Sequence, residues 1–147
     1  MTAKQYLSRI GRLDEKIRQI EEEIRYLQEM AGGLQSPAMD QDRVQTSSGD
    51  SRHAAAVNKW IDKENELEKL KLKQADMRIR ILKQIHQLDN VKHIQLLYLR
   101  YFKYKRLEEI ACIMKKSDGS EYSYVHIVRM HGEALSEFSK KFKKYLK

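Results

Sequence analysis

The chain has 147 residues and a net charge of +8, with 34% charged residues, one proline and a single cysteine, Cys112. This balance is typical of long, solvated helices rather than of a sheet protein, and one cysteine excludes an internal disulfide. No stretch approaches the roughly 18 apolar residues of a membrane span, and the charged N-terminus lacks the apolar core of a signal peptide. We therefore expect a cytoplasmic protein without a membrane partner.

The positive charge is concentrated in the second half of the sequence. Residues 1–31 are neutral overall, residues 32–50 carry −2, residues 51–88 carry +4 and residues 89–147 carry +6. A basic surface of this kind suits a polyanion such as nucleic acid, although charge alone does not identify the partner.

The first segment predicts one long helix over residues 3–31. Its apolar residues alternate spacings of three and four: Ala3, Tyr6, Ile10, Leu13, Ile17, Ile20, Ile24, Leu27 and Ala31. This pattern keeps a narrow seam on one side of a helix, as in a coiled coil, whereas an ordinary amphipathic helix would show a wider stripe. Thr2 is suited to cap the start of the helix, and Gly32-Gly33 to end it.

Residues 32–53 are rich in Gly, Ser, Asp and Gln, and we expect a flexible loop there. A second long helix is predicted from about residue 51 to residue 88, with a rougher seam: Val57, Trp60, Ile61, Leu67, Leu70, Met77, Ile81, Ile85 and Leu88. Two long helices joined by such a loop most simply fold back as an antiparallel hairpin. The second seam is interrupted by Glu64 and Gln74 and leaves room for a partner, so self-association through the hairpin stays open.

Shorter elements follow the "LDN" sequence at residues 88–90, where Asp89 or Asn90 is suited to cap a new helix. The segments "VKHIQLLYLRYFK" and "LEEIACIM" read as short helices, and a polar stretch then precedes a final helix over residues 124–146. Short helices joined by a turn, with polar and aromatic residues at the start of the second, are typical of a helix-turn-helix. The second helix of that motif lies in the major groove of DNA.

The final helix divides its residues between packing and contact. With Ser123 as N-cap, one stripe points inward: Ile127, Met130, Ala134, Leu135 and Phe138. The predicted DNA-binding residues lie before or outside that stripe: Lys115, Lys116, Tyr122, Ser123, Tyr124, Val125, His126 and Arg129. Arg129 is suited to a guanine edge or a phosphate, and the two lysines to phosphates that set position without reading sequence.

Other candidate residues have plainer interpretations. His126 and His131 are five apart with no metal-ligand pattern around them, so no metal is expected. Glu108 and Glu109 diverge by about 100° on a helix and favour its N-terminal dipole rather than acid–base chemistry. Cys112 lies among apolar residues and is expected in the core. We find no catalytic constellation or cofactor motif and expect a chain that is not an enzyme.

The second half resembles the C-terminal, region-four domain of bacterial sigma factors. That family carries Leu-Arg on one helix, Glu-Glu-Ile-Ala on the next, and a Ser-capped recognition helix ending in Ala-Leu. The matching residues here are Leu99-Arg100, Glu108-Glu109-Ile110-Ala111, Ser123 and Ala134-Leu135. The whole layout is similar to phage and prophage regulators of the ArpU/RinA type, which share the "TAKQYL" start, the "SP…DRVQTSSGD" middle and the "YSYVHIVRMHG" helix.

The resemblance implies a prophage-encoded, sequence-specific regulator of late phage transcription in a bacterial cell, binding double-stranded DNA. RNA polymerase is a further partner that it leaves open. The family's turn between the two helices is short, whereas residues 115–120 lengthen it here, and the role of this extended turn is open. The sequence thus predicts an all-α chain: a coiled-coil hairpin over residues 1–88, and a sigma region-four-like helix-turn-helix domain over residues 89–147.

Two other functions remain possible on the sequence. A DNA-packaging protein of the phage terminase small-subunit kind also joins a helix-turn-helix to helical oligomerisation segments, and a ring of many subunits would favour it. A coiled-coil adaptor would bind acidic protein rather than DNA, and salt-dependent binding to one DNA sequence would exclude it.

Overall fold

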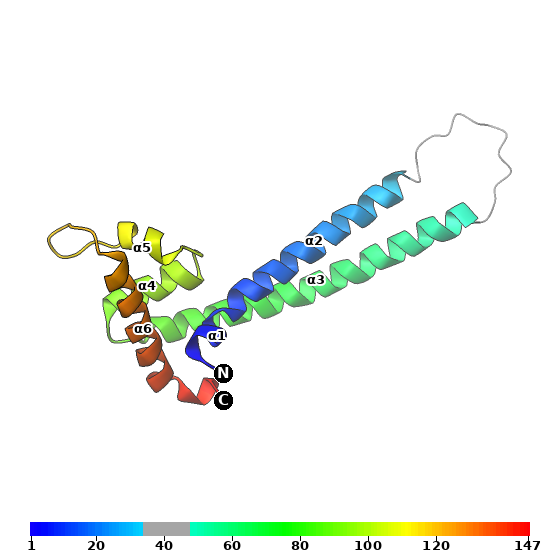
Figure 1. The fold of residues 1–147 in the computed structure, drawn as a ribbon. Coiled ribbons are helices and arrows are strands. Elements are labelled where there is room, and N and C mark those ends of the chain that lie inside the picture. Colours follow the sequence, from blue (N-terminus) through cyan, green and yellow to red (C-terminus); the bar gives the residue numbers. More distant parts are fainter. Residues whose placement is uncertain (34–47) are drawn as a thin grey trace. The chain divides into compact units, whose positions relative to one another are not determined.

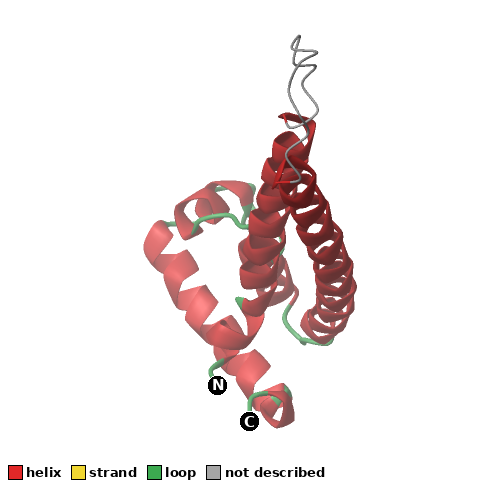
Figure 2. Ribbon diagram, turned by 90° about the vertical axis from the view of Figure 1, so that its right-hand side faces the viewer, coloured by secondary structure: helices red, strands yellow, loops and turns green. Residues whose placement is uncertain are grey.

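The computed structural model describes residues 1–33 and 48–147, which are helical almost throughout (Figures 1 and 2). The helices are α1 (Ala3–Leu7), α2 (Arg9–Gly33), α3 (Ser48–His86), α4 (Val91–Tyr101), α5 (Leu107–Ile113), α6 (Tyr124–Lys141) and the 3-10 helix η1 (Lys143–Tyr145). The described residues contain one isolated β-bridge and no strand. The predicted all-α class is confirmed for this part of the chain.

The helix boundaries differ from the predicted ones in three places. The final helix, predicted over residues 124–146, ends at Lys141 and is followed by the short helix η1. α3 begins at Ser48, inside the predicted loop, whose residues 34–47 lie outside the described part of the chain. The first predicted helix is divided at Ser8, whose hydroxyl donates to the Lys4 carbonyl at 2.7 Å. A serine that bonds back to the preceding turn tends to bend a helix.

Thr2 caps α1 as predicted. Its hydroxyl accepts from the Gln5 N–H at 3.1 Å, and the Gln5 carboxamide oxygen accepts from the Thr2 N–H at 2.9 Å. These two bonds form a capping box, which satisfies donors that the first turn of a helix cannot pair internally.

One compact unit comprises residues 14–73, where the end of α2 and the beginning of α3 run side by side in opposite directions (Figure 1). Lys63 Nζ lies 3.0 Å from Glu23 Oε2, and Lys71 Nζ lies 3.0 Å from Glu21 Oε1. Exposed ion pairs of this kind contribute at most about 1 kcal/mol each. Apolar burial therefore stabilises this unit more than its charges do.

The predicted α2 seam is found in this unit. Its buried members are Ile17, Ile20, Ile24 and Ala31. On α3, Trp60 is half-buried and donates from Nε1 to Glu64 Oε1 at 2.8 Å. Ile61, predicted to join the seam, is 49% exposed, because neighbouring helix residues point about 100° apart and Trp60 takes the inward position.

The second unit comprises residues 1–13 and 74–147. Its largest fully buried side chains come from α1, α2, α3, α4, α5, α6 and the residue after α5: Leu7, Ile10, Ile81, Ile85, Leu96, Leu97, Ile110, Met114, Ile127 and Phe138. Helix α6 packs against α1, α4 and α5 (Figure 1). The predicted domain boundary at residue 88 stays a prediction, but the core around α6 includes residues on both sides of it.

Among the described helices, none has both the length and the apolar character needed to cross a membrane.

Candidate nucleic-acid interface

Helix α5 is anchored at its start by a local carboxylate. The Glu109 side chain accepts from the Arg106 N–H at 2.8 Å, and this bond lowers the pKa of Glu109. Glu108 and Glu109 both lie in the first turn of α5, as the sequence predicted. Their negative charges interact favourably with the positive end of the helix dipole. Ile110, Ala111 and Met114 are buried and attach the helix to the core.

The extended turn between α5 and α6 is a small hairpin with its own hydrogen bonds. Lys115 and Glu121 form an antiparallel bridge, and the Lys116 N–H donates to the Ser120 carbonyl at 2.9 Å. Gly119 has a φ of +82°, the left-handed region in which glycine carries no steric cost. The turn therefore has a defined local fold.

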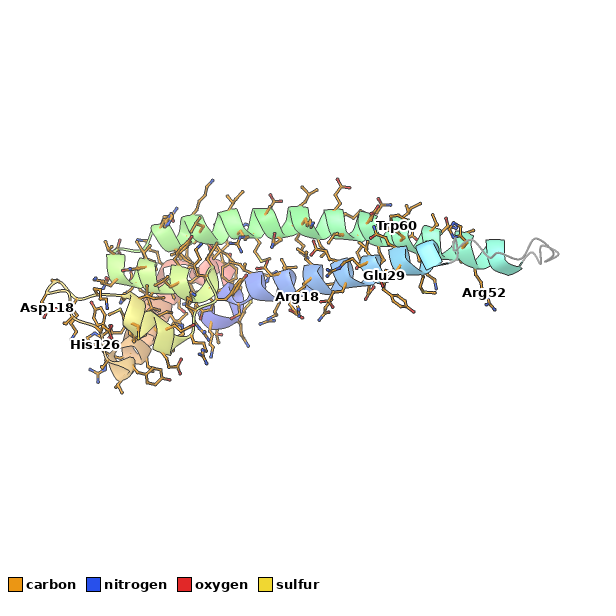
Figure 3. All side chains as sticks on the ribbon, turned by 90° about the horizontal axis from the view of Figure 1, so that it is seen from above. Arg18, Glu29, Arg52, Trp60, Asp118 and His126 are labelled. Atoms are coloured by element: carbon orange, nitrogen blue, oxygen red, sulfur yellow. The ribbon has the colours of Figure 1, made fainter. Side chains whose placement is uncertain are left out.

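Asp118 lies at the end of this hairpin (Figure 3). Its carboxylate accepts from the Ser120 hydroxyl and N–H, and both bonds lower the pKa of Asp118. The two bonds hold the end of the hairpin in one conformation, as an Asx-type turn does.

The two lysines predicted to contact phosphate differ in their surroundings. Lys115 Nζ pairs with Glu121 Oε1 at 3.0 Å. Lys116 Nζ lies 5.7 Å from the centre of the half-buried Tyr122 ring. Lys92 Nζ lies 5.9 Å from the same ring centre. Since Lys115 already has a carboxylate partner, Lys116 is better placed to bind a phosphate.

Lys92 was not identified from the sequence. Its Nζ donates to the Lys115 carbonyl at 2.8 Å and so joins the first turn of α4 to the hairpin. The two residues are 23 positions apart, and no local pattern indicates their contact. Tyr122 also lies beside His126, with ring centres 5.0 Å apart.

Helix α6 begins as the sequence predicted. The Ser123 hydroxyl accepts from the His126 N–H at 3.2 Å, which makes Ser123 the N-cap. This bond uses one lone pair of the hydroxyl oxygen, and the hydroxyl hydrogen stays available to donate to a ligand. The predicted inward stripe is also found: Ile127, Met130, Ala134 and Phe138 are buried and Leu135 is half-buried.

The remaining predicted contact residues of α6 lie on the surface. Tyr124 is 49% exposed and Val125 is 67% exposed, while His126 and Arg129 are exposed as well. Figure 3 shows His126 in the first turn of α6, next to the hairpin that carries Asp118. The structure thus groups the candidate residues of the hairpin and the first two turns of α6 around one end of this unit.

The surroundings of Cys112 differ from the predicted ones, and those of His131 are now defined. Cys112 is exposed rather than buried, because Ile110, Ala111 and Met114 take the inward positions of α5 and its end. His131 is half-buried, and its Nε2 lies 3.1 Å from the Tyr101 hydroxyl.

Burial sets the ionisation of the Tyr101–His131 pair. Desolvation raises the pKa of Tyr101 to about 12. It also lowers the pKa of His131 to about 4, with smaller contributions from the charges of Arg100 and Lys4. Both side chains are therefore neutral near pH 7, and the tyrosine hydroxyl can donate to the unprotonated ring nitrogen. Over the described residues, no cluster of three or more His, Cys, Asp or Glu side chains is placed to hold a metal.

A polar cluster holds the second half of α6 against the start of α4. Glu137 bonds to the buried His93 ring and accepts from the Asp89 N–H at 2.7 Å. Burial by itself would raise the pKa of Glu137, but these hydrogen bonds outweigh it and lower that pKa. Lys141 donates to the Asp89 carboxylate at 2.9 Å. This cluster holds the C-terminal half of α6, whereas the exposed candidate residues lie in its N-terminal turns.

No family model, curated protein or solved structure matches the chain.

Proposed function

We propose that the chain is a sequence-specific DNA-binding transcription regulator. In this proposal α5, the hairpin of residues 115–121 and the beginning of α6 form a helix-turn-helix, and α6 lies in the major groove of duplex DNA. One observation carries the proposal: α6 exposes several side chains of its first turns while a second set on the same helix is buried. The exposed residues are Tyr124, Val125, His126 and Arg129, and the buried ones are Ile127, Met130, Ala134 and Phe138. A recognition helix needs this division, because it must contact base edges and remain attached to its own domain.

The charge distribution supports a polyanionic partner. Residues 89–147 contain thirteen basic and seven acidic residues, for a net charge of +6. Lys116 and Arg129 are both exposed. Phosphate contacts from such side chains set the register of a protein on DNA, and base-edge contacts from the helix add sequence preference.

The family and the cellular setting are part of the same proposal. The resemblance to ArpU/RinA-type regulators, with a region-four-like motif, suggests a prophage-encoded protein that acts on late phage promoters in the bacterial cytoplasm. Residues 1–88 would form a coiled-coil hairpin that brings two copies together on DNA, and RNA polymerase would be a further partner. The hairpin of residues 115–121 is compatible with this function because it is internally bonded and ends in an exposed loop.

The test is in vitro selection from a random duplex library, followed by fluorescence anisotropy on the selected sequence. We expect log affinity to fall linearly with log salt, by about 0.9 per neutralised phosphate. Arg129→Ala should weaken binding by roughly 1–3 kcal/mol, the range for one good base contact.

Arg25→Ala is a matched control, since Arg25 is an exposed arginine of α2 and the substitution removes the same charge. If both variants bind the selected duplex equally well, Arg129 does not read it. If no sequence is enriched and binding is absent at low salt, the proposed function is wrong. A ring of many subunits in light scattering would instead favour DNA packaging.

A further inference from the structure

Two valines lie on the exposed surface of α6, beside charged residues such as Arg129. Val125 is 67% exposed and Val128 is 41% exposed, in a chain whose residues are 34% charged. Valine is a poor residue for a helix surface in water, because its branched side chain loses rotamer freedom there and forms no hydrogen bond. Packing within the described chain does not require either valine at these exposed positions.

These positions lie together on the helix. Residues 125, 128 and 132 fall within about 60° of the circumference, roughly opposite the buried Ile127 and Ala134. Gly132, the third of them, is inside the helix and exposed. A Cβ added to Gly132 would meet no described heavy atom within 4 Å. Because Gly132 has no side chain, a partner could approach the helix backbone closely at this position.

We propose that Val125 and Val128 read the 5-methyl groups of thymine in the major groove. This inference rests on the proposed function and adds the kind of base that is recognised. The thymine methyl is the apolar feature that base pairs present in that groove, and small apolar side chains contact it. Arg129 follows Val128 directly and can reach a neighbouring guanine or phosphate.

Charge complementarity favours DNA over an apolar protein partner on this face. Arg129 lies about 40° from Val125 around the helix, and Lys116, in the hairpin that leads into α6, is also exposed. Lys92 of α4 lies over the ring of Tyr122, just before the N-cap of α6. Val125 and Val128 are separated by roughly 4.5 Å along the helix axis, which is comparable to the rise of about 3.4 Å between base pairs. The two valines can therefore reach the methyl groups of one thymine or of two nearby thymines.

The experiment replaces thymine with uracil, which keeps the Watson–Crick pairing and removes only the methyl group. Each thymine of the selected duplex is exchanged in turn, and affinity is measured by anisotropy with the intact protein. We expect one or two positions at which the exchange weakens binding about fourfold, the effect of losing one buried methyl-sized group. At each of those positions the exchange should have a smaller effect in whichever variant, Val125→Ala or Val128→Ala, shortens the side chain that contacts the methyl.

Val91→Ala supplies the matched control, because Val91 is 73% exposed on α4, outside the proposed interface. It should retain the full sensitivity to uracil. The thermal unfolding midpoint of each variant shows that the exposed substitutions leave the fold intact.

The outcomes separate this inference from the function on which it rests. A selected duplex that depends on Arg129 but tolerates uracil everywhere would overturn the reading of thymine and leave the DNA-binding function in place. Methyl sensitivity that stays undiminished in both α6 valine variants would also overturn it, since another residue would then contact the methyl. Failure to enrich any duplex would remove the proposed function and this inference together.

Discussion

Gly132 offers a direct test of the local reasoning about α6. Because it lies inside the helix and a Cβ there has open space, Gly132→Ala should stabilise the protein. Glycine is roughly 0.5–1 kcal/mol less favourable than alanine in a helix interior. For a chain of this length, that gain corresponds to a rise of about 1–4 °C in the unfolding midpoint.

Gly119→Ala is the matched control, since a Cβ also has open space there but the backbone φ is +82°. Alanine in that left-handed conformation costs about 1–2 kcal/mol. The same chemical change should therefore have opposite signs at the two positions. Circular dichroism followed during heating, in the absence of DNA, measures both.

A lowered midpoint for Gly132→Ala would refute the reasoning, because it would mean that the α6 surface is packed against something or that the helix is strained there. A rise in midpoint combined with weaker binding of the selected duplex is the pattern expected if this face enters the groove. Unchanged binding in a bulkier variant, Gly132→Leu, would place the face outside the DNA interface.

Three further predictions concern the two units. The pKa of His131 is about 4 in the folded protein, against 6.5 for an ordinary histidine. Because the unfolded chain binds a proton more readily, the free energy of unfolding should be highest above pH 6.5 and should decrease as pH falls from 6.5 towards 4. His131→Gln should reduce that slope in denaturant unfolding measured across this pH range, and an unaltered slope would contradict the assignment. Phe138→Ala removes a fully buried ring that lies against Tyr6 and Phe142, and should cost about 3–5 kcal/mol in denaturant unfolding; a loss below 1 kcal/mol would show that this core is loosely packed. Ile17→Asp places a charge in the seam of α2 and should destabilise residues 14–73 by on the order of 3–5 kcal/mol in urea unfolding, whereas Lys16→Asp, on the exposed side, should cost less than about 1 kcal/mol.

The parts of the fold that could be predicted depend on residues close together in sequence. The Ser123 cap and the inward stripe of α6 follow from spacing alone, because a helix repeats every 3.6 residues whatever lies around it. The capping box at Thr2 is equally local. Periodicity does not decide between adjacent apolar residues, and it left open whether Trp60 or Ile61 would face inward. Cys112 was expected in the core because its neighbours are apolar, but α5 turns it outward.

The parts that could not be predicted are contacts between distant segments. Lys92 meets Lys115, and His93 meets Glu137, across 23 and 44 positions of sequence. Nothing in the local pattern of either segment indicates its partner. The lengthened turn was visible as extra residues, but its hairpin depends on the pairing of Lys115 with Glu121, which sequence alone leaves open.

The way in which α6 is held explains how an exposed face could be specific. The helix packs against α1, α4 and α5, and Glu137 connects its second half to His93 and the backbone of Asp89. A helix fixed in this way presents Val125, Val128 and Arg129 in one orientation before any partner arrives. Side chains that are already positioned lose less entropy on binding, so more of each contact appears as affinity and as discrimination between bases. Because α1 and the last turns of α3 supply part of that core, the start of the chain helps to keep α6 in place and, under the proposed function, would contribute to recognition in this way.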